Sequence, residues 1–245
     1  MASTALIAGL GPGFGVELAW KLADAGYQLA FLARSEDYLE EQAAELRDAG
    51  HEALAVPTDV TDPDAVATGF DAVRDEFGSV DVLSIQVSQE AGWSSFDDLT
   101  VEEFRTALDL YGFGTFLCAK EAFEDMRESG GTILVLGVTP RYGVGHGHGY
   151  VSACGAKRKL VESMARELGS YGIHVIHAAV DGVILNPDME ELAPKPIEEE
   201  RFMDPESVAE VCLSAIEQDE GCWSSSIDLR SPVDDLPFIY EEMLD

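Results

Sequence analysis

Apolar runs alternate with longer amphipathic segments along most of the chain. The apolar runs predict buried strands at Thr4–Ala8, Tyr27–Ala33, Ala53–Pro57, Val80–Val87, Thr132–Leu136 and Ile173–Val180. The segments between them carry helix start and stop signals and predict helices at Phe14–Ala25, Glu36–Ala49, 62–77, Thr100–Arg127 and Tyr150–Leu168. This alternation predicts an α/β fold, with a single doubly wound parallel sheet that is covered by helices on both faces.

The pattern changes beyond residue 180. Residues 186–200 are rich in proline and acid and predict a loop, whereas Pro205–Gln218 predicts a last helix and Ile227–Leu229 an edge strand. No internal repeat or linker interrupts the chain. We therefore expect one domain over residues 1–245.

Three glycines, Gly9, Gly13 and Gly15, stand directly between the first strand and the first helix. Glycine lets a backbone turn tightly and approach a pyrophosphate, which the N-terminus of the helix that begins at Phe14 then stabilises. The alternative is a plain tight turn. Because a strand precedes the loop and a helix follows it, the spacing favours dinucleotide binding.

The charge excludes several functions. Fifteen basic and 47 acidic residues give a net charge of −32, which argues against binding to nucleic acid or to an anionic membrane. The acids are spread over most predicted helices, which favours adaptation to molar salt over an ordinary acidic protein. No apolar stretch approaches the roughly 18 residues of a membrane span, no signal peptide is visible, and four cysteines without C-x-x-C spacing indicate a reducing compartment. We expect a cytoplasmic protein.

Several further segments carry a family resemblance. They are the G-x-x-x-G-x-G loop, Thr58-Asp59-Val60, Asp81-Val82-Leu83, Gly114-Thr115-Phe116-Leu117, Glu167-Leu168 and Tyr171-Gly172-Ile173-His174-Val175. With them, the chain resembles the short-chain dehydrogenase/reductase family over nearly its whole length. The resemblance implies a Rossmann-like fold, a nicotinamide cofactor, a small carbonyl or alcohol substrate and a substrate lid at residues 186–204. It also implies a homo-oligomer, a dimer or tetramer, formed through the helices at Thr100–Arg127 and Tyr150–Leu168.

The resemblance also assigns cofactor contacts, to Gly9, Gly13, Phe14 and Gly15 in the loop and to Asp59 and Val60 after the third strand. NAD-selective relatives carry an acid where this chain has Ala33. Arg34 and Ser35 follow it and suit a ribose 2′-phosphate. We therefore expect NADP(H), with NAD(H) as the alternative.

The catalytic set of the family is only partly present. Its tyrosine falls on Tyr150, but the lysine position holds Cys154, the serine position Gly137 and the asparagine position Tyr111. The resemblance therefore implies an oxidoreductase that transfers hydride, with Tyr150 as its catalytic residue. The alternative is an NADP(H)-binding protein without turnover.

Three other features remain open in the sequence. Lys157 lies on the same predicted helix face as Tyr150 and could reach a ribose, but a solvated surface lysine is favoured. His146 and His148 form an H-x-H pair without a third ligand, so no metal is expected and a glycine-rich surface loop is favoured over a replacement acid or base. Trp93 either lines the substrate pocket or simply packs.

Overall fold

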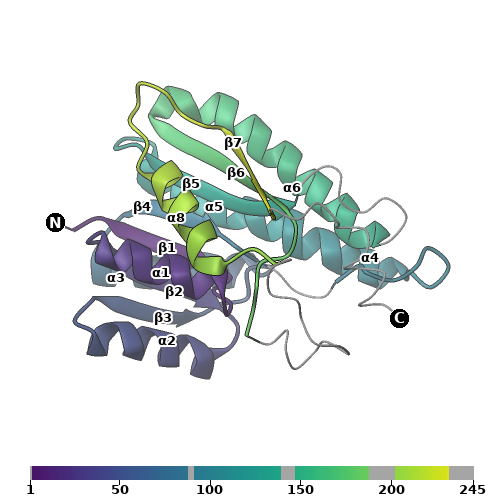
Figure 1. Cartoon of the computed structure of the whole chain (residues 1–245), viewed down its shortest axis with the longest axis horizontal. Helices are drawn as coiled ribbons and strands as arrows, with labels where there is room; N and C mark the ends of the chain where they lie inside the picture. The colour runs from purple at the N-terminus through teal and green to yellow at the C-terminus, as the bar shows by residue number, and fades with distance from the viewer. Residues whose placement is uncertain (1, 88–90, 139–146, 188–201, 232–245) are drawn as a thin grey trace.

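The computed structural model describes residues 2–87, 91–138, 147–187 and 202–231 (Figure 1). Its strands are β1 (Thr4–Ala8), β2 (Gln28–Ala33), β3 (Ala53–Pro57), β4 (Val80–Ile85), β5 (Gly131–Val138), β6 (Ile173–Asp181) and β7 (Ser226–Arg230). Its helices are α1 (Phe14–Asp24), α2 (Glu36–Asp48), α3 (Pro63–Phe77), α4 (Val101–Ala107), α5 (Gly114–Met126), α6 (His148–Glu167) and α8 (Pro205–Ile216). A π-helical segment, η1 (Leu108–Phe113), and a 3₁₀ turn, η2 (Leu168–Tyr171), complete the described elements.

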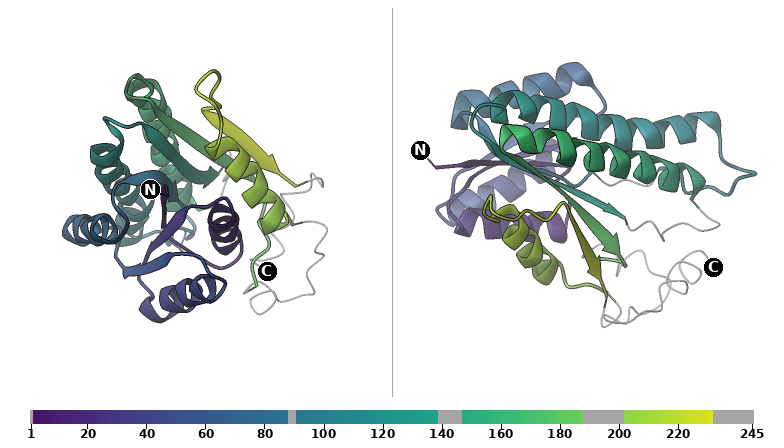
Figure 2. Two further views of the ribbon diagram at one scale, coloured as in Figure 1. Left: turned by 90° about the vertical axis from the view of Figure 1, so that its left-hand side faces the viewer. Right: turned by 90° about the horizontal axis from the view of Figure 1, so that it is seen from above.

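The strands form one parallel sheet in the order β3-β2-β1-β4-β5-β6-β7. Helices α1, α2 and α8 lie on one face of the sheet and α3, α5 and α6 on the other (Figure 2). Their buried side chains form one core on each face. Strands β1 and β6 are buried along their whole length, as expected for strands covered on both faces. The predicted doubly wound α/β fold is confirmed.

Local sequence chemistry sets several element ends. At α3, the Asp62 carboxylate accepts hydrogen bonds from the backbone amides of Asp64 and Ala65, and Pro63 occupies the first turn. Both features favour a helix start. The same helix ends at Gly78, whose φ of 88° costs a residue without a Cβ little.

The structure corrects one predicted helix. Thr100–Arg127 was expected to be a single helix, but the structure divides it into α4, η1 and α5. A π turn shifts the register of all side chains after it. Gly114 follows directly, where a Cβ would lie 3.1 Å from the Val60 carbonyl oxygen. The missing side chain at Gly114 therefore lets α5 approach the loop after β3 closely.

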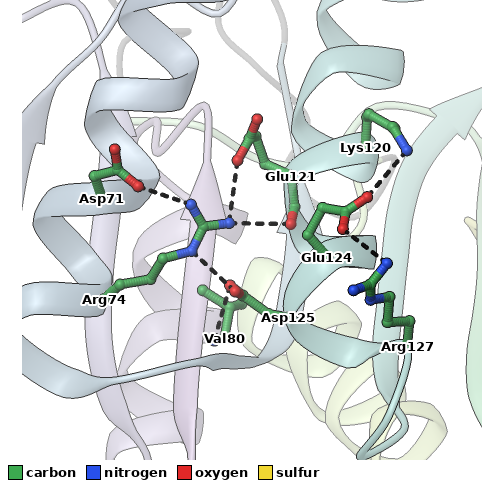
Figure 3. A network of polar contacts seen from close by, with 8 residues as sticks. All are labelled: Asp71, Arg74, Val80, Lys120, Glu121, Glu124, Asp125 and Arg127. Carbon is green, nitrogen blue, oxygen red and sulfur yellow. Dashed lines mark hydrogen bonds and ion pairs between the residues drawn. The ribbon is translucent and has the colours of Figure 1, made fainter.

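Arg74 on α3 joins two helices through three carboxylates (Figure 3). It contacts Asp71 on its own helix at 2.9 Å, and Glu121 and Asp125 on α5 at 3.1 and 2.9 Å. The other oxygen of Asp125 accepts a hydrogen bond from the backbone amide of Val80. One cation therefore serves three acids, an arrangement that leaves a negative excess around it.

None of the helices that the structure describes is long and apolar enough to cross a membrane. The four cysteines are all free thiols; Cys118, Cys154 and Cys212 are buried and Cys222 is exposed. The expectation that they form no disulfide framework agrees with the structure.

Candidate cofactor and active site

A cleft of about 480 Å³ opens at the carboxyl ends of the central strands. Residues 9–12, 14–15, 33–35, 58–60, 86–87 and 184–186 line it, together with Leu110 and Leu136. The sheet order reverses between β1 and β4, and ligands of doubly wound folds bind at such a switch point. Of the residues predicted to hold the cofactor, Gly13 lines an adjoining cleft and the others line this one.

Three glycines of the loop, Gly9, Gly13 and Gly15, each make a close contact that a side chain would block. A Cβ on Gly9 would lie 2.7 Å from the Val87 backbone, and one on Gly13 would lie 2.8 Å from the Leu185 carbonyl oxygen. Both residues also have positive φ, at 88° and 78°. A Cβ on Gly15 would lie 2.8 Å from the side-chain oxygen of Gln86. The three glycines therefore let the loop pack directly against residues 86–87 and 185, and α1 directs its N-terminal amides toward the cleft.

Arg34 and Ser35 lie at the start of α2, on the rim of the cleft. Ser35 is the N-cap residue, yet its side chain makes no capping hydrogen bond. Asp59 faces this corner and accepts hydrogen bonds from the amide and hydroxyl of Thr61, at 2.9 and 2.7 Å. The hydrogen bond from the Thr61 amide is the largest influence on the pKa of Asp59 and lowers it. The Thr61 hydroxyl and the Arg34 charge lower it further, so the pKa stays below its ordinary value although burial opposes this.

Tyr150 lies near the start of α6, packed between two aromatic rings. The Trp93 ring stacks on it at 4.4 Å, and the Tyr111 ring meets it edge-on at 5.2 Å. Its hydroxyl is hydrogen-bonded to Cys154. Burial, followed by the interaction with Cys154, raises the pKa of Tyr150 well above its usual value. Tyr150 is not among the described lining residues of the cleft, but its neighbour Tyr111 directly follows the lining residue Leu110.

A close backbone contact fixes Trp93 against Tyr150. The backbone amide of Tyr150 donates to the Gly92 carbonyl at 3.1 Å. A Cβ on Gly92 would lie 2.5 Å from that amide nitrogen, and one on Gly149 would lie 2.8 Å from the Gly92 Cα. The glycines therefore allow the start of α6 to touch the loop after β4. Of the two interpretations of Trp93, packing against the candidate catalytic residue is what the structure shows.

Other side chains occupy the space of the missing catalytic residues. Tyr111 is 2% exposed and fills the neighbourhood of Tyr150 from η1. Gly137 on β5 lies against His177 on β6, and a Cβ there would be 2.3 Å from the imidazole Nε2. His177 is 2% exposed, and neither ring nitrogen has a hydrogen-bond partner among the described residues. Burial, reinforced by the charges of Arg158 and Lys157, lowers the pKa of His177 to about 4.

Lys157 is buried, which corrects the expectation of a solvated surface lysine. It is 4% exposed, and its ammonium donates to the Leu136 carbonyl at 2.8 Å and lies 5.2 Å from the centre of the Tyr111 ring. Burial lowers its pKa, against the opposing influence of Cys154. The reason for the error lies in the helix face. Two turns after Tyr150, this face packs against β5 and η1 rather than facing water.

We expect Gly137→Ser to lower the free energy of unfolding by about 1–3 kcal/mol, because the new side chain must displace His177 from a packed position. Thermal unfolding in molar KCl measures this. Gly155→Ser is the matched control, because a Cβ on Gly155 meets nothing within 4 Å. In a His177→Ala background the serine should cost markedly less, and an equal cost in both backgrounds would refute the contact.

Some sequence candidates lie outside the described residues. They are His146 and most of the predicted lid, residues 188–201. His148 is described, on the first turn of α6, where its ring meets that of Phe96 edge-on at 5.4 Å.

The fold and its cleft define a protein of the doubly wound, nucleotide-binding class. The sequence profile of the family described as short chain dehydrogenase matches residues 3–195. The chain therefore belongs to the short-chain dehydrogenase family.

Named relatives and solved structures agree with this assignment. A cis-4-hydroxycyclohexanecarboxylate dehydrogenase of Sinomonas cyclohexanicum is 32% identical over 173 residues, which cover 70% of this chain and 69% of the relative. A versicolorin reductase of Emericella nidulans is 32% identical over 190 residues, 74% of this chain and 68% of the relative. The structure of an alcohol dehydrogenase from the archaeon Thermococcus sibiricus, complexed with 5-hydroxy-NADP, is 26% identical with a TM-score of 0.83 and covers 95% of this chain and 97% of its own. These relatives are dehydrogenases and reductases, which places the chain in the general class of oxidoreductases.

Proposed function

We propose that the protein is an NADP(H)-dependent reductase of small carbonyl compounds, with Tyr150 as the proton donor. The observation that carries this proposal is the glycine-floored cleft at the β1–β4 switch point, with Arg34 and Ser35 on its rim. The family membership supplies the reaction class, hydride transfer between a nicotinamide and a carbonyl or alcohol. No feature of the described residues selects one substrate.

The cleft residues fit a dinucleotide with a 2′-phosphate. A pyrophosphate bound over the glycine loop would lie beside the N-terminus of α1, whose free amides would stabilise its charge. Arg34 is the cationic side chain among the described lining residues. With the uncommitted hydroxyl of Ser35 and the N-terminus of α2, it offers donors for a phosphate.

Reduction is the direction that this site favours. Bound NADPH would supply the hydride that a carbonyl carbon receives. Tyr150 would donate its phenolic proton to the carbonyl oxygen, and its raised pKa keeps that proton in place at neutral pH. Alcohol oxidation needs a base to accept the proton, which a protonated phenol cannot supply.

The measurement is NADPH consumption over a panel of aldehydes and ketones in molar KCl, compared with NADP⁺ reduction over the matching alcohols.

An NADP(H)-binding protein without turnover is the second candidate. The contact between Gly137 and His177 favours this second candidate. The His177 imidazole lies against the position where the family has its catalytic serine. The same assay separates the two. Tight NADPH binding by calorimetry, with no consumption over the whole panel, would establish the binding protein and refute the reductase.

We also infer adaptation to high salt, and expect the melting temperature to rise by several degrees between millimolar and molar KCl. The net charge of −32 repels itself at low ionic strength, and molar salt screens this repulsion. Sucrose at equal osmolality is the control for excluded-solute effects. An equal response to KCl and sucrose would mean that charge screening is not the cause. A cytoplasmic location stays a prediction.

Self-association is expected to use the surface formed by α4, η1 and α5. Its exposed apolar side chains are Val101, Phe104, Phe113 and Phe116, which are 87%, 36%, 41% and 45% exposed. Leu117 and Phe123, further along the same segment, instead pack on the core. We expect light scattering in molar KCl to give a multiple of 26.4 kDa and Phe116→Asp to dissociate it. A wild-type monomer would contradict this expectation.

A further inference from the structure

Cys154 and Lys157 continue the face of α6 that carries Tyr150. Spacings of four and three residues place the three side chains along one side of the helix. Both residues are 4% exposed. The Tyr150 hydroxyl is hydrogen-bonded to the Cys154 sulfur, and the Lys157 ammonium interacts electrostatically with that sulfur. Phenol, thiol and ammonium thus form one buried line.

The Lys157 ammonium is held without a counter-ion among the described residues. Its contacts are the Leu136 carbonyl at 2.8 Å and the face of the Tyr111 ring at 5.2 Å. The charged or titratable groups around it are Cys154 and Arg158 on its own helix, Tyr111 on η1 and His177 on β6.

The nearby carboxylate, Glu162, is engaged elsewhere, because it accepts from Arg158 at 2.8 Å and from Lys159 at 2.6 Å. A buried cation without an ion pair costs stability, and an apolar side chain of similar size would remove that cost. Such a cost is often retained where activity requires it.

We propose that Cys154 and Lys157 are positioning residues for Tyr150, and that they replace by a different arrangement the cation that the lysine position of the family would hold. In the resting site the Tyr150 hydroxyl donates to the Cys154 sulfur. Once the phenolic proton has left, the thiol donates to the Tyr150 oxygen, and the Lys157 ammonium stabilises the negative charge that appears there. The inference rests on the proposed function.

The proton balance of the step is simple. The O–H bond of Tyr150 breaks as its proton moves to the substrate carbonyl oxygen, while the carbonyl carbon receives the hydride. The phenolate that remains accepts the hydrogen bond of Cys154 beside the ammonium of Lys157. A proton from water restores the phenol when the alcohol leaves. Because burial opposes a charge on Tyr150, the step needs such a nearby cation.

Lys157→Met is the central test, with Lys159→Met as its matched control. Lys159 lies on the same helix with 78% of its side chain exposed, and it pairs with Glu162. We expect Lys157→Met to lower kcat for carbonyl reduction by about 10- to 100-fold, with unchanged KM and NADPH affinity and an equal or higher melting temperature. Lys159→Met should retain wild-type kcat. Cys154→Ser should keep most of the activity because it keeps a donor, and Cys154→Ala should lose it.

Two results would overturn the inference in the turnover assay. One is a wild-type kcat in Lys157→Met or Cys154→Ala. The other is a joint fall of kcat and melting temperature in Lys157→Met, which would indicate a structural role alone.

A second measurement does not depend on turnover, so it separates this inference from the proposed function. The tyrosines are replaced by 3,5-difluorotyrosine, which ionises nearer neutrality, and the fluorine resonance of Tyr150 is assigned by its absence in Tyr150→Phe. We expect Lys157→Met to raise the pKa of this phenol relative to wild type and to Lys159→Met. An unchanged pKa would refute the inference even in an active enzyme. If Lys157→Met raises this pKa but the wild type shows no turnover, the roles of Cys154 and Lys157 are supported and the proposed reductase function is refuted.

Discussion

Replacing Tyr150 with phenylalanine should lower kcat for carbonyl reduction by about 100- to 10,000-fold, the usual contribution of a general acid. The phenol is hydrogen-bonded to Cys154 and packed between Trp93 and Tyr111. Loss of its oxygen therefore removes a proton without disturbing the ring. Because the cleft is lined by other residues, NADPH affinity measured by calorimetry should stay within a factor of about two, a difference of roughly 0.4 kcal/mol.

Tyr171→Phe is the control for this result. Tyr171 is 45% exposed and meets Phe123 edge-on at the far end of α6, so its change should leave kcat alone. If Tyr150→Phe retains turnover, another group must carry the proton, and His148, on the first turn of α6, is the described candidate.

Arg34→Ala should weaken NADPH binding by about 10- to 100-fold and leave NADH binding almost unchanged. The guanidinium stands on the cleft rim at the start of α2, and a charge-assisted contact to a phosphate contributes about 1.5–3 kcal/mol. Glu36 and Asp37 occupy the first turn of α2, so without Arg34 this corner would repel a 2′-phosphate. Both affinities are measured by calorimetry at one fixed KCl concentration, since screening weakens the contact.

Arg127→Ala provides a control of equal charge. Arg127 is half-exposed and pairs with Glu124 at 3.3 Å on α5, so its loss changes the net charge without touching the cleft. Equal wild-type affinities for NADPH and NADH, or an Arg34→Ala variant with full NADPH affinity, would show that the cofactor selection was wrongly inferred.

The sheet and the glycine loop could be predicted because their signals are local. Apolar runs marked the strands, and Gly9, Gly13 and Gly15 stood between a strand and a helix, where chain order alone fixes their place at the switch point. The π segment could not be foreseen in this way. A helical pattern of apolar residues continues through η1, so the sequence does not distinguish this segment from an ordinary α-helix.

The burial of Lys157 and His177 was missed for a different reason. Helical periodicity put Lys157 on the face of Tyr150, but it did not say that this face lies against β5 and η1. For His177 a signal was present in the sequence, because this residue lies within an apolar run. The run forms a strand with β5 and β7 on either side, and such a strand is covered by helices on both faces. Its imidazole is therefore buried. Its contact with Gly137 arises between strands and needs the register of the sheet.

The contact between Gly137 and His177 also restricts how this site could change over evolutionary time. A hydroxyl side chain cannot be introduced at position 137 by a single mutation without a steric collision with the imidazole. A smaller residue at position 177 must appear first, and on its own it leaves an unfilled space in the core. Each substitution alone is therefore expected to lower stability, whereas the two together would make room for a serine at position 137.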